Sequence, residues 1–280
     1  MRLLTRPRNV PVEKFDAKTG CWTDVGARAT VDRNELTVTT YNVWNDSLHA
    51  EDRYLAIAEL LSQRAPDIVV FQEITPTALD VLLDQSWIRK DYLRAAVVGG
   101  DAGNYGMLVL SRWPVSRATY TRLPTRQSRG FLQTELAVNG TRTVVCCLHL
   151  DSGKPSRWLR WWQLRRIFRA HESVEDAVLL GDFNMRDDEN HWIAAPYCDV
   201  WPALRPDEDG FTENTSINLM RYDMKDKHRH VRFDRVLLKG PSWAGSEIEL
   251  LGKEPISADL PRVFPSDHFG VECRLTRRSP

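Results

Sequence analysis

Residues 177–187, AVLLGDFNMRD, are the stretch that decides the fold. The first four residues form a short apolar run of the kind found in buried strands. Asp182 and Asn184 follow this run, and in an extended segment both would lie on one face and reach the same water molecule. Asp and Asn also initiate turns and cap helices, so this segment alone leaves a purely structural explanation open.

Other polar residues occur in the same setting, within or at the end of an apolar, strand-like run. They lie in Tyr41-Asn42-Val43-Trp44, Phe71-Gln72-Glu73, Leu148-His149-Leu150, Phe233-Asp234-Arg235 and Ser266-Asp267-His268. Each motif alone has a commoner explanation as a turn or a packed residue. Carboxylates, amides and imidazoles brought together at one sheet edge can hold a hard metal ion and surround a phosphate with donors. The set therefore predicts the chemistry of a metal-dependent phosphodiesterase.

In the order of these motifs, the chain resembles the endonuclease/exonuclease/phosphatase superfamily from about residue 36 to residue 275. Within it, the motifs are most similar to the subfamily of 5′-tyrosyl-DNA phosphodiesterases. The likeness is carried by His149-Leu150-Asp151-Ser152, residues 181–187, Asp199-Val200-Trp201, Arg232-Phe233-Asp234-Arg235, Leu250-Leu251-Gly252 and Phe264-Pro265-Ser266-Asp267-His268. The resemblance implies an α/β fold of two packed mixed β-sheets flanked by helices, the DNase I-like four-layer αββα sandwich.

The resemblance also implies a magnesium site, in which manganese could substitute. Glu73 would be the direct ligand, and Asn42 and Asp267 would hold metal-bound waters or the phosphate, because magnesium keeps much of its hydration shell. Glu73 follows an apolar run and would be poorly placed unless its carboxylate emerged at a polar site. The alternative is a strand-end glutamate that points to solvent.

The family assigns Asp182 and Asn184 to orienting and deprotonating the attacking water. His268 would donate to a non-bridging phosphate oxygen, and Asp234 would orient its imidazole as a carboxylate does in a hydrolase triad. His149 would be a second phosphate donor. Two alternatives remain open, since Asp234 could pair with a neighbouring arginine and His149 could be a packed core residue.

Residues that would contact the substrate are also implied by the resemblance: Ser152, Lys154, Arg186, Phe233 and Arg235. Lys154 stands where the subfamily would carry an arginine, which replaces a bidentate fork with a point charge. This departure bears on the choice of substrate more than on the chemistry.

Two polar segments have either a functional or a purely structural explanation. Residues 158–169 have helical spacing that places Trp158, Trp162, Arg165, Arg166 and Arg169 together on one side. Such a face could bind nucleic acid, or it could belong to an amphipathic helix whose tryptophans pack under a loop. The polar residues 205–232 could likewise contact DNA or form a solvated loop.

Length and composition favour one catalytic domain over residues 36–280. With 280 residues and 42% hydrophobic content the chain can bury a large core, and no linker or repeat divides it. Residues 1–35 lack periodicity and are expected to form an ordered strap or a mobile tail. The 38 basic and 38 acidic residues balance, so any nucleic-acid binding must depend on local basic patches.

The pattern of apolar residues predicts strands at 36–43, 67–71, 105–111, 131–138, 141–150, 177–180, 231–238 and 270–275. It predicts helices at 54–61, from about Pro76, and at 155–170. Asn139-Gly140 between two alternating runs is a strong hairpin signal.

No run of eighteen apolar residues occurs, and the five cysteines show no CxxC spacing. We therefore expect a soluble, intracellular protein, cytoplasmic or nuclear, with no membrane contact. The expected activity is magnesium-dependent hydrolysis of 5′-tyrosyl-DNA or similarly blocked nucleic-acid ends by direct attack of water, with DNA 5′ ends as partners. The alternatives are an apurinic endonuclease, a general nuclease, an RNA exonuclease, or a non-catalytic nucleic-acid binding protein.

Overall fold

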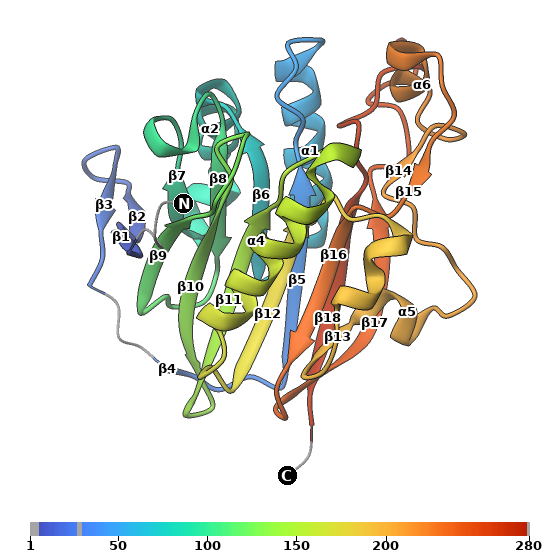
Figure 1. Cartoon of the computed structure of the whole chain (residues 1–280). Coiled ribbons are helices and arrows are strands. Elements are labelled where there is room, and N and C mark those ends of the chain that lie inside the picture. Colours follow the sequence, from blue (N-terminus) through green and yellow to red (C-terminus); the bar gives the residue numbers. More distant parts are fainter. Residues whose placement is uncertain (1–5, 27–29, 279–280) are drawn as a thin grey trace.

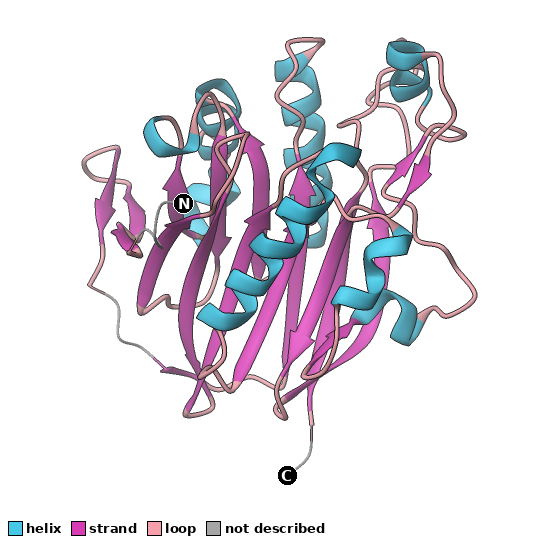
Figure 2. Ribbon diagram, viewed as in Figure 1, coloured by secondary structure: helices cyan, strands magenta, loops and turns pink. Residues whose placement is uncertain are grey.

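The computed structural model describes residues 6–26 and 30–278 and contains two eight-stranded β-sheets that pack face to face (Figure 1). Helices cover the outer faces of both sheets (Figure 2). This arrangement confirms the predicted four-layer sandwich. Residues 1–5 and 27–29 of the predicted N-terminal extension lie outside the described residues.

The first sheet has the strand order β1-β9-β10-β11-β12-β16-β13, with β4 beside β10. Its strands are β1 (Arg8–Val10), β4 (Thr30–Val31), β9 (Arg117–Arg122), β10 (Gly130–Val138), β11 (Thr141–His149), β12 (Asp176–Asp182), β13 (Tyr197–Asp199) and β16 (Asp234–Lys239). Strands β11 and β12 run parallel and align His149 with Asp182, and the antiparallel partner β16 aligns Asp234 with Asp182. Three predicted site residues therefore lie side by side where three neighbouring strands of this sheet begin or end.

The second sheet has the order β17-β18-β5-β6-β8-β7-β2-β3. Its strands are β2 (Glu13–Asp16), β3 (Cys21–Asp24), β5 (Glu35–Asn42), β6 (Ile68–Ile74), β7 (Leu93–Val97), β8 (Gly106–Ser111), β17 (Trp243–Leu251) and β18 (Gly270–Arg277). Parallel pairing of β5 with β6 brings Asn42 beside Gln72, next to Glu73. A separate two-stranded antiparallel sheet pairs β14 (Glu213–Asn214) with β15 (His230–Val231).

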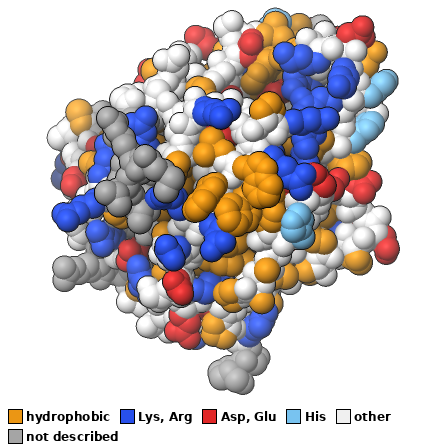
Figure 3. Space-filling view, viewed as in Figure 1, with side chains coloured by type: hydrophobic (Ala, Val, Ile, Leu, Met, Phe, Trp, Pro, Cys, Tyr) orange, Lys and Arg blue, Asp and Glu red, His pale blue; other side chains and the backbone are white. Residues whose placement is uncertain are grey.

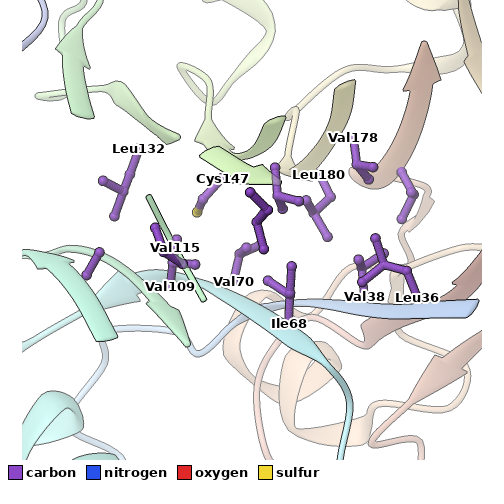
Figure 4. Close-up of a cluster of buried hydrophobic side chains, with 14 of the residues drawn as sticks. Leu36, Val38, Ile68, Val70, Val109, Val115, Leu132, Cys147, Val178 and Leu180 are labelled. Atoms are coloured by element: carbon purple, nitrogen blue, oxygen red, sulfur yellow. The ribbon is translucent and has the colours of Figure 1, made fainter. Parts of the chain in front are cut away.

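The main hydrophobic core fills the space between the sheets and includes Val38, Val70, Leu132 and Val178 (Figure 4). Successive strand residues point to opposite faces, so neighbouring residues enter different cores. Cys147 lies in the core between the sheets, whereas Cys146 lies in the core that includes Leu164 and Ile167 of the helix over the first sheet. The two adjacent cysteines therefore point to opposite faces of the first sheet.

Helices α1 (Ala50–Arg64), α2 (Pro76–Leu83) and α3 (Ser86–Asp91) pack on the second sheet, and α4 (Arg157–Ala170) packs on the first. The short helices α5 (Val200–Leu204) and α6 (Leu219–Lys225) lie in the C-terminal third, and short 3₁₀ helices span Gly100–Ala102, Lys154–Ser156 and Asp187–Trp192. Helix α2 begins as its sequence predicts, with Pro76 in the first turn and the Thr75 hydroxyl accepting from the amide of Ala78. None of the described helices has the length and apolar character needed to cross a membrane.

Most predicted elements are found. The differences are a split in one predicted strand and additional strands in the N-terminal extension. The Asn139-Gly140 turn has φ of 50° and 77°, the two positive values that a two-residue hairpin loop requires. The strand expected at 231–238 is instead split, because Phe233 leaves the ladder and its carbonyl accepts from the amide of Phe183. Among the described residues of the N-terminal extension, β1 pairs with β9 and β4 with β10 of the first sheet, and β2 joins β3 to β7 of the second. These strands lack the local periodicity that would have revealed them.

A buried ion pair fastens α4 to the segment that follows β12. Arg160 donates from Nε and Nη2 to the Glu189 carboxylate at 2.8 and 2.5 Å, and both side chains are 1% exposed. The remaining nitrogen, Nη1, donates to the backbone carbonyls of Asp151 and Gly153. Arg160 therefore holds the loop after His149 in place as well as the helix.

Replacing Glu189 with alanine should lower the free energy of unfolding by about 3–5 kcal/mol, because it leaves the Arg160 charge buried and unpaired. Denaturant unfolding followed by circular dichroism measures this change. The exposed Glu172→Ala variant is the control and should change stability by less than about 0.5 kcal/mol. A loss below about 1 kcal/mol for Glu189→Ala would mean that water or a neighbour compensates the arginine.

Candidate active site

A pocket lies where the ends of β6, β11 and β12 meet the loops after β5 and before β18. Seven of the predicted catalytic and substrate-contact residues line it together with Glu73 and Asp267: His149, Ser152, Asp182, Asn184, Arg186, Phe233 and His268. Asn42 and Asp234 lie directly beneath it, in contact with Asp182 and His268 respectively. The structure thus brings all eight predicted catalytic residues together.

The Asp182 carboxylate accepts three hydrogen bonds, and the residue is 1% exposed. Its Oδ2 accepts from Asn42 Nδ2 at 3.1 Å and Asn184 Nδ2 at 3.0 Å, and His149 Nε2 lies 3.3 Å away. Burial alone would raise the pKa of this carboxyl, but the hydrogen bond from His149 and the charges of His268 and Arg129 hold it well below its usual range. Asp182 therefore stays ionised at neutral pH, with fixed orientation.

Asn184 does not continue an extended segment, as the alternation of residues had suggested. Its φ is 50°, in the left-handed region that Asn tolerates better than most residues, and its backbone N–H donates to Asp182 Oδ1 at 2.8 Å. The segment turns because the Asp182 carboxylate captures this amide. Asn184 therefore orients Asp182 directly through both its backbone and its side chain.

Glu73 was expected to end its strand, but it lies inside β6. The pairing of β6 with β8 shifts register between Gln72 and Ile74, and Glu73 has a φ of 62°. A bulge of this kind redirects a side chain, and a left-handed conformation in a non-glycine residue is a strain that often marks functional sites. The bulge turns the carboxylate into the pocket, where Oε2 accepts from the amide of Asn45 at 3.1 Å.

Asn42 orients Asp182 and is not among the residues that line the pocket. Its Nδ2 donates to Asp182, and its Oδ1 accepts from the amide of Trp44 at 3.0 Å. The amide thus positions Asp182. Its Oδ1 keeps a second lone pair, so the expected contact with metal or metal-bound water stays a prediction.

His268 and Asp234 form the pair expected from the sequence. His268 Nδ1 lies 2.7 Å from Asp234 Oδ2, and both residues are buried. Burial alone would lower the pKa of His268, but the carboxylates of Asp234 and Asp267 raise it well above its ordinary value. The ring is therefore an imidazolium at neutral pH, with Nε2 as its second donor.

Arg129 is a site residue that was not predicted from the sequence. It is 4% exposed, and its Nη1 donates to the Tyr105 hydroxyl at 2.7 Å and lies 3.0 Å from His149 Nδ1. Because a guanidinium can only donate, His149 Nδ1 must accept, which assigns the ring proton to Nε2 beside Asp182. No local pattern in the sequence around Arg129 signals this contact.

A second group that was not predicted comes from the polar segment 205–232, which forms the far wall of the pocket. Buried Glu213 accepts from Arg221 Nε at 2.6 Å and pairs with Arg229 Nη2 at 3.2 Å. Arg221 Nε also lies 3.6 Å from Asp267 Oδ2. Glu213 thus holds two cations at the pocket, which supports the substrate-contact explanation of this segment over a solvated loop.

Two predicted substrate residues lie outside the pocket lining. Lys154 is exposed in the 3₁₀ turn before α4. Arg235 is 1% exposed and donates to Asp199 at 2.8 Å. The expectation that Arg235 contacts substrate is corrected, because a guanidinium without solvent access cannot reach a phosphate.

The donor set at Glu73 and Asp267 fits a hard divalent cation. Burial and the nearby Glu73 charge raise the pKa of Asp267 to about 6, against the opposing effect of His268. Two carboxylates that repel each other in this way gain from a cation between them. Their ligand atoms are oxygens, and no cysteine is among the described pocket residues, so the site suits magnesium or manganese better than zinc.

A second group of possible ligands has a better explanation without metal. Atoms of Asp182, Asp234 and His268 lie within 4.8 Å of one another. Here, however, His268 Nδ1 lies 2.7 Å from Asp234 Oδ2, so two of the three groups are already paired with each other. We therefore place the candidate cation at Glu73 and Asp267.

Comparison with known proteins gives concordant results. The sequence model of the Endonuclease/Exonuclease/phosphatase family matches residues 39–268. Tyrosyl-DNA phosphodiesterase 2 of Danio rerio is 29% identical over 262 residues, which cover 88% of this chain and 68% of that protein. The Homo sapiens protein of the same name is 26% identical over 251 residues, covering 83% of this chain and 66% of that protein. The chain thus spans about two thirds of these relatives.

A crystal structure of the D. rerio protein in complex with a single-stranded DNA product superposes with a TM-score of 0.78 at 24% identity. The match covers 86% of this chain and 99% of that one. At this identity the likeness supports the fold, the four-layer arrangement described above.

Proposed function

The chain belongs to the endonuclease/exonuclease/phosphatase family of phosphoester hydrolases, and on this premise we propose that it hydrolyses the bond between a tyrosine and the 5′ phosphate of DNA, or a similarly blocked nucleic-acid end. The observation that carries the proposal is the buried Asp182 carboxylate, held by Asn42, Asn184 and His149 across from the His268–Asp234 pair. Such an arrangement orients a water on one side of a phosphorus atom and binds its oxygens on the other.

Asp182 would orient the attacking water and take its proton as the new bond to phosphorus forms. Two amide donors, Asn42 and Asn184, occupy its Oδ2, and among the described residues Oδ1 accepts from the Asn184 backbone amide alone, so a lone pair remains for a water in the pocket. The low pKa makes this carboxylate a weak base toward free water. Proton transfer is therefore expected late, once the attacking oxygen has become acidic.

Two histidines would bind the non-bridging phosphate oxygens. His268 offers Nε2–H of an imidazolium, and His149 offers the Nε2–H that Arg129 assigns to it. Charge-assisted donors aimed at a phosphoryl oxygen stabilise the charge that builds up in the transition state. Arg186, Arg221 and Arg229 add positive charge at the pocket rim, where the adjoining strand would enter.

Enzymes of this family depend on divalent metal ions, and we propose magnesium at Glu73 and Asp267. When bound, the ion would supply Lewis-acid stabilisation of phosphoryl oxygens. Glu73 and Asp267 would hold it, while Asn45 and Arg221 keep these two carboxylates oriented.

The tyrosyl leaving group is supported by the named relatives and by the chemistry of a phenol. A phenol has a pKa of about 10 and can leave without full protonation by a dedicated acid. An abasic or unmodified strand would instead require the departure of a sugar hydroxyl, which is a poorer leaving group.

A substrate panel tests this proposal. The purified protein with magnesium should release tyrosine from a 5′-phosphotyrosyl oligonucleotide and leave a 5′ phosphate, at least about tenfold faster than it cuts the other substrates. The comparison substrates are the unmodified strand, an abasic duplex and an RNA strand of the same sequence. KM for the tyrosyl strand should rise with salt, because arginines at the rim would replace counterions on the phosphates.

Faster nicking of the abasic duplex, or faster degradation of the plain strands, would contradict the tyrosyl proposal and leave the family membership intact. The Asp182→Asn variant, assayed alongside, identifies activity from a contaminating nuclease.

A further inference from the structure

A patch of tryptophan and arginine side chains lies on the outer face of α4, outside the pocket. Trp158 and Trp162 are 69% and 49% exposed. Trp161 packs edge-on against both, with ring centroids 6.1 and 5.1 Å apart. Hydrophobic side chains gather in the middle of this face of the molecule, with lysines and arginines around them (Figure 3). We call Trp158, Trp161, Trp162, Arg165, Arg166 and Arg169 the Trp–Arg patch.

The patch is positively charged without local compensation. Helix α4 contains five arginines and no acidic residue. Arg160 is neutralised by Glu189, and Arg157 pairs with Asp188 at 2.8 Å. The other three, Arg165, Arg166 and Arg169, form no ion pair within residues 6–26 and 30–278, and the Arg165 guanidinium lies 4.8 Å from the centre of the Trp161 ring.

Packing of the helix does not explain the exposed rings. The face of α4 that meets the sheet is formed by Leu164, Ile167, Gln163 and the Arg160 ion pair. Trp158 and Trp162 leave large apolar surfaces in solvent, and clustered exposed apolar surface usually marks a binding site. The alternative that these tryptophans pack under a loop is therefore contradicted by their exposure.

The patch begins close to the pocket in the sequence. Ser152 and Gly153 line the pocket, and α4 starts four residues after Gly153. Strand β11 ends at His149 beside the pocket, and α4 runs back along the first sheet from there, so its first turn, with Trp158, is at the pocket end of the sheet (Figure 1). Trp162 follows about 6 Å farther along the helix axis. A strand that leaves the pocket on this side would meet the two rings in succession.

We propose that the Trp–Arg patch binds unpaired nucleotides of a nucleic-acid strand whose end is held in the pocket. Tryptophan faces stack on bases and the arginines contact phosphates, a combination typical of sites for single strands. A duplex fits less well, because its bases are already stacked in pairs. This inference rests on the proposed function for the strand end in the pocket, but binding can be measured without hydrolysis.

The test compares strands of two lengths with the Trp158→Ala/Trp162→Ala double variant. Fluorescence anisotropy gives Kd for a 3′-labelled, 5′-phosphorylated thymidine strand of about four nucleotides and for one of about fifteen. The variant should bind the long strand at least about tenfold more weakly and the short strand within about twofold of wild type. Leu55→Ala, which removes an exposed apolar side chain from α1, is the matched control and should change neither Kd.

A second variant tests the charges separately. Arg166→Gln/Arg169→Gln should reduce the slope of log affinity against log salt for the long strand by about 0.7 for each phosphate that the arginines no longer neutralise. Lys18→Gln, exposed in the turn between β2 and β3, should leave the slope unchanged.

Unchanged long-strand affinity in the tryptophan variant would overturn the inference, as would equal weakening for both lengths. So would a variant that keeps full DNA affinity while losing self-association in sedimentation, or losing adsorption to vesicles of anionic lipid. Those results would make the patch an interface between copies or a membrane contact. Length-dependent binding in a protein that hydrolyses no tyrosyl substrate would support the patch and reject the proposed function alone.

Discussion

Replacing Asp182 with asparagine is expected to lower kcat on a 5′-phosphotyrosyl oligonucleotide by about a hundredfold or more, because the change removes the group that accepts the proton of the attacking water. The substitution keeps the size of the side chain. It also replaces one acceptor of the hydrogen bonds from Asn42 and Asn184 with a donor, so some loss of orientation adds to the loss of basicity. Single-turnover kinetics at saturating enzyme measure the effect on chemistry without product release.

The control for this experiment is Asp187→Asn, a change of the same kind at an exposed carboxylate five residues away. It should leave kcat within about twofold of wild type, as expected for a solvated surface position. A correctly folded Asp182→Asn protein that retains a near-normal rate would mean that another group accepts the proton.

Removal of divalent metal is expected to abolish turnover, and added magnesium or manganese should restore it. Glu73 and Asp267 are hard oxygen donors whose mutual repulsion a bound cation would relieve. Stripped protein in excess EDTA measures the loss of activity. The metal should also raise the unfolding temperature of the stripped protein in a concentration-dependent way, because it binds the folded state only.

The Glu73→Gln variant extends this prediction to a single residue. It should raise the magnesium concentration needed for half-maximal rate by at least about tenfold and remove most of the thermal shift, because it replaces a charged ligand with a neutral one. Glu51→Gln, at an exposed position in the first turn of α1, should leave both values unchanged. Full turnover in excess EDTA after stripping would reject the metal-dependent mechanism.

The two exposed tryptophans show that a helical pattern can predict which residues share a face without predicting what that face contacts. The spacing of residues 158–169 predicted a helix with one face inward, and α4 has that face at Leu164 and Ile167. Whether Trp158 and Trp162 would be covered depended on which loops cross α4. Residues far apart in the chain form those loops, and no periodicity within the helix reports their path.

The local chemistry of the sequence determined the central elements of this protein and indicated eight polar residues that the structure brings together at one pocket. Apolar runs that end in polar residues predicted the central strands, and Asn139-Gly140 predicted a hairpin that the structure contains, since each depends on neighbours along the chain. The order of the polar motifs was enough to indicate the family, because each motif is short and local.

Only the tertiary structure decided how these residues are used. Asn42 reaches Asp182 across 140 positions of sequence, and that contact gives it a role in orienting a carboxylate that its own motif does not predict. The bulge that turns Glu73 into the pocket depends on its pairing with β8, and the proton on His149 depends on Arg129, which follows no motif. Such contacts join segments that are not neighbours in the sequence, and their energies depend on register and burial.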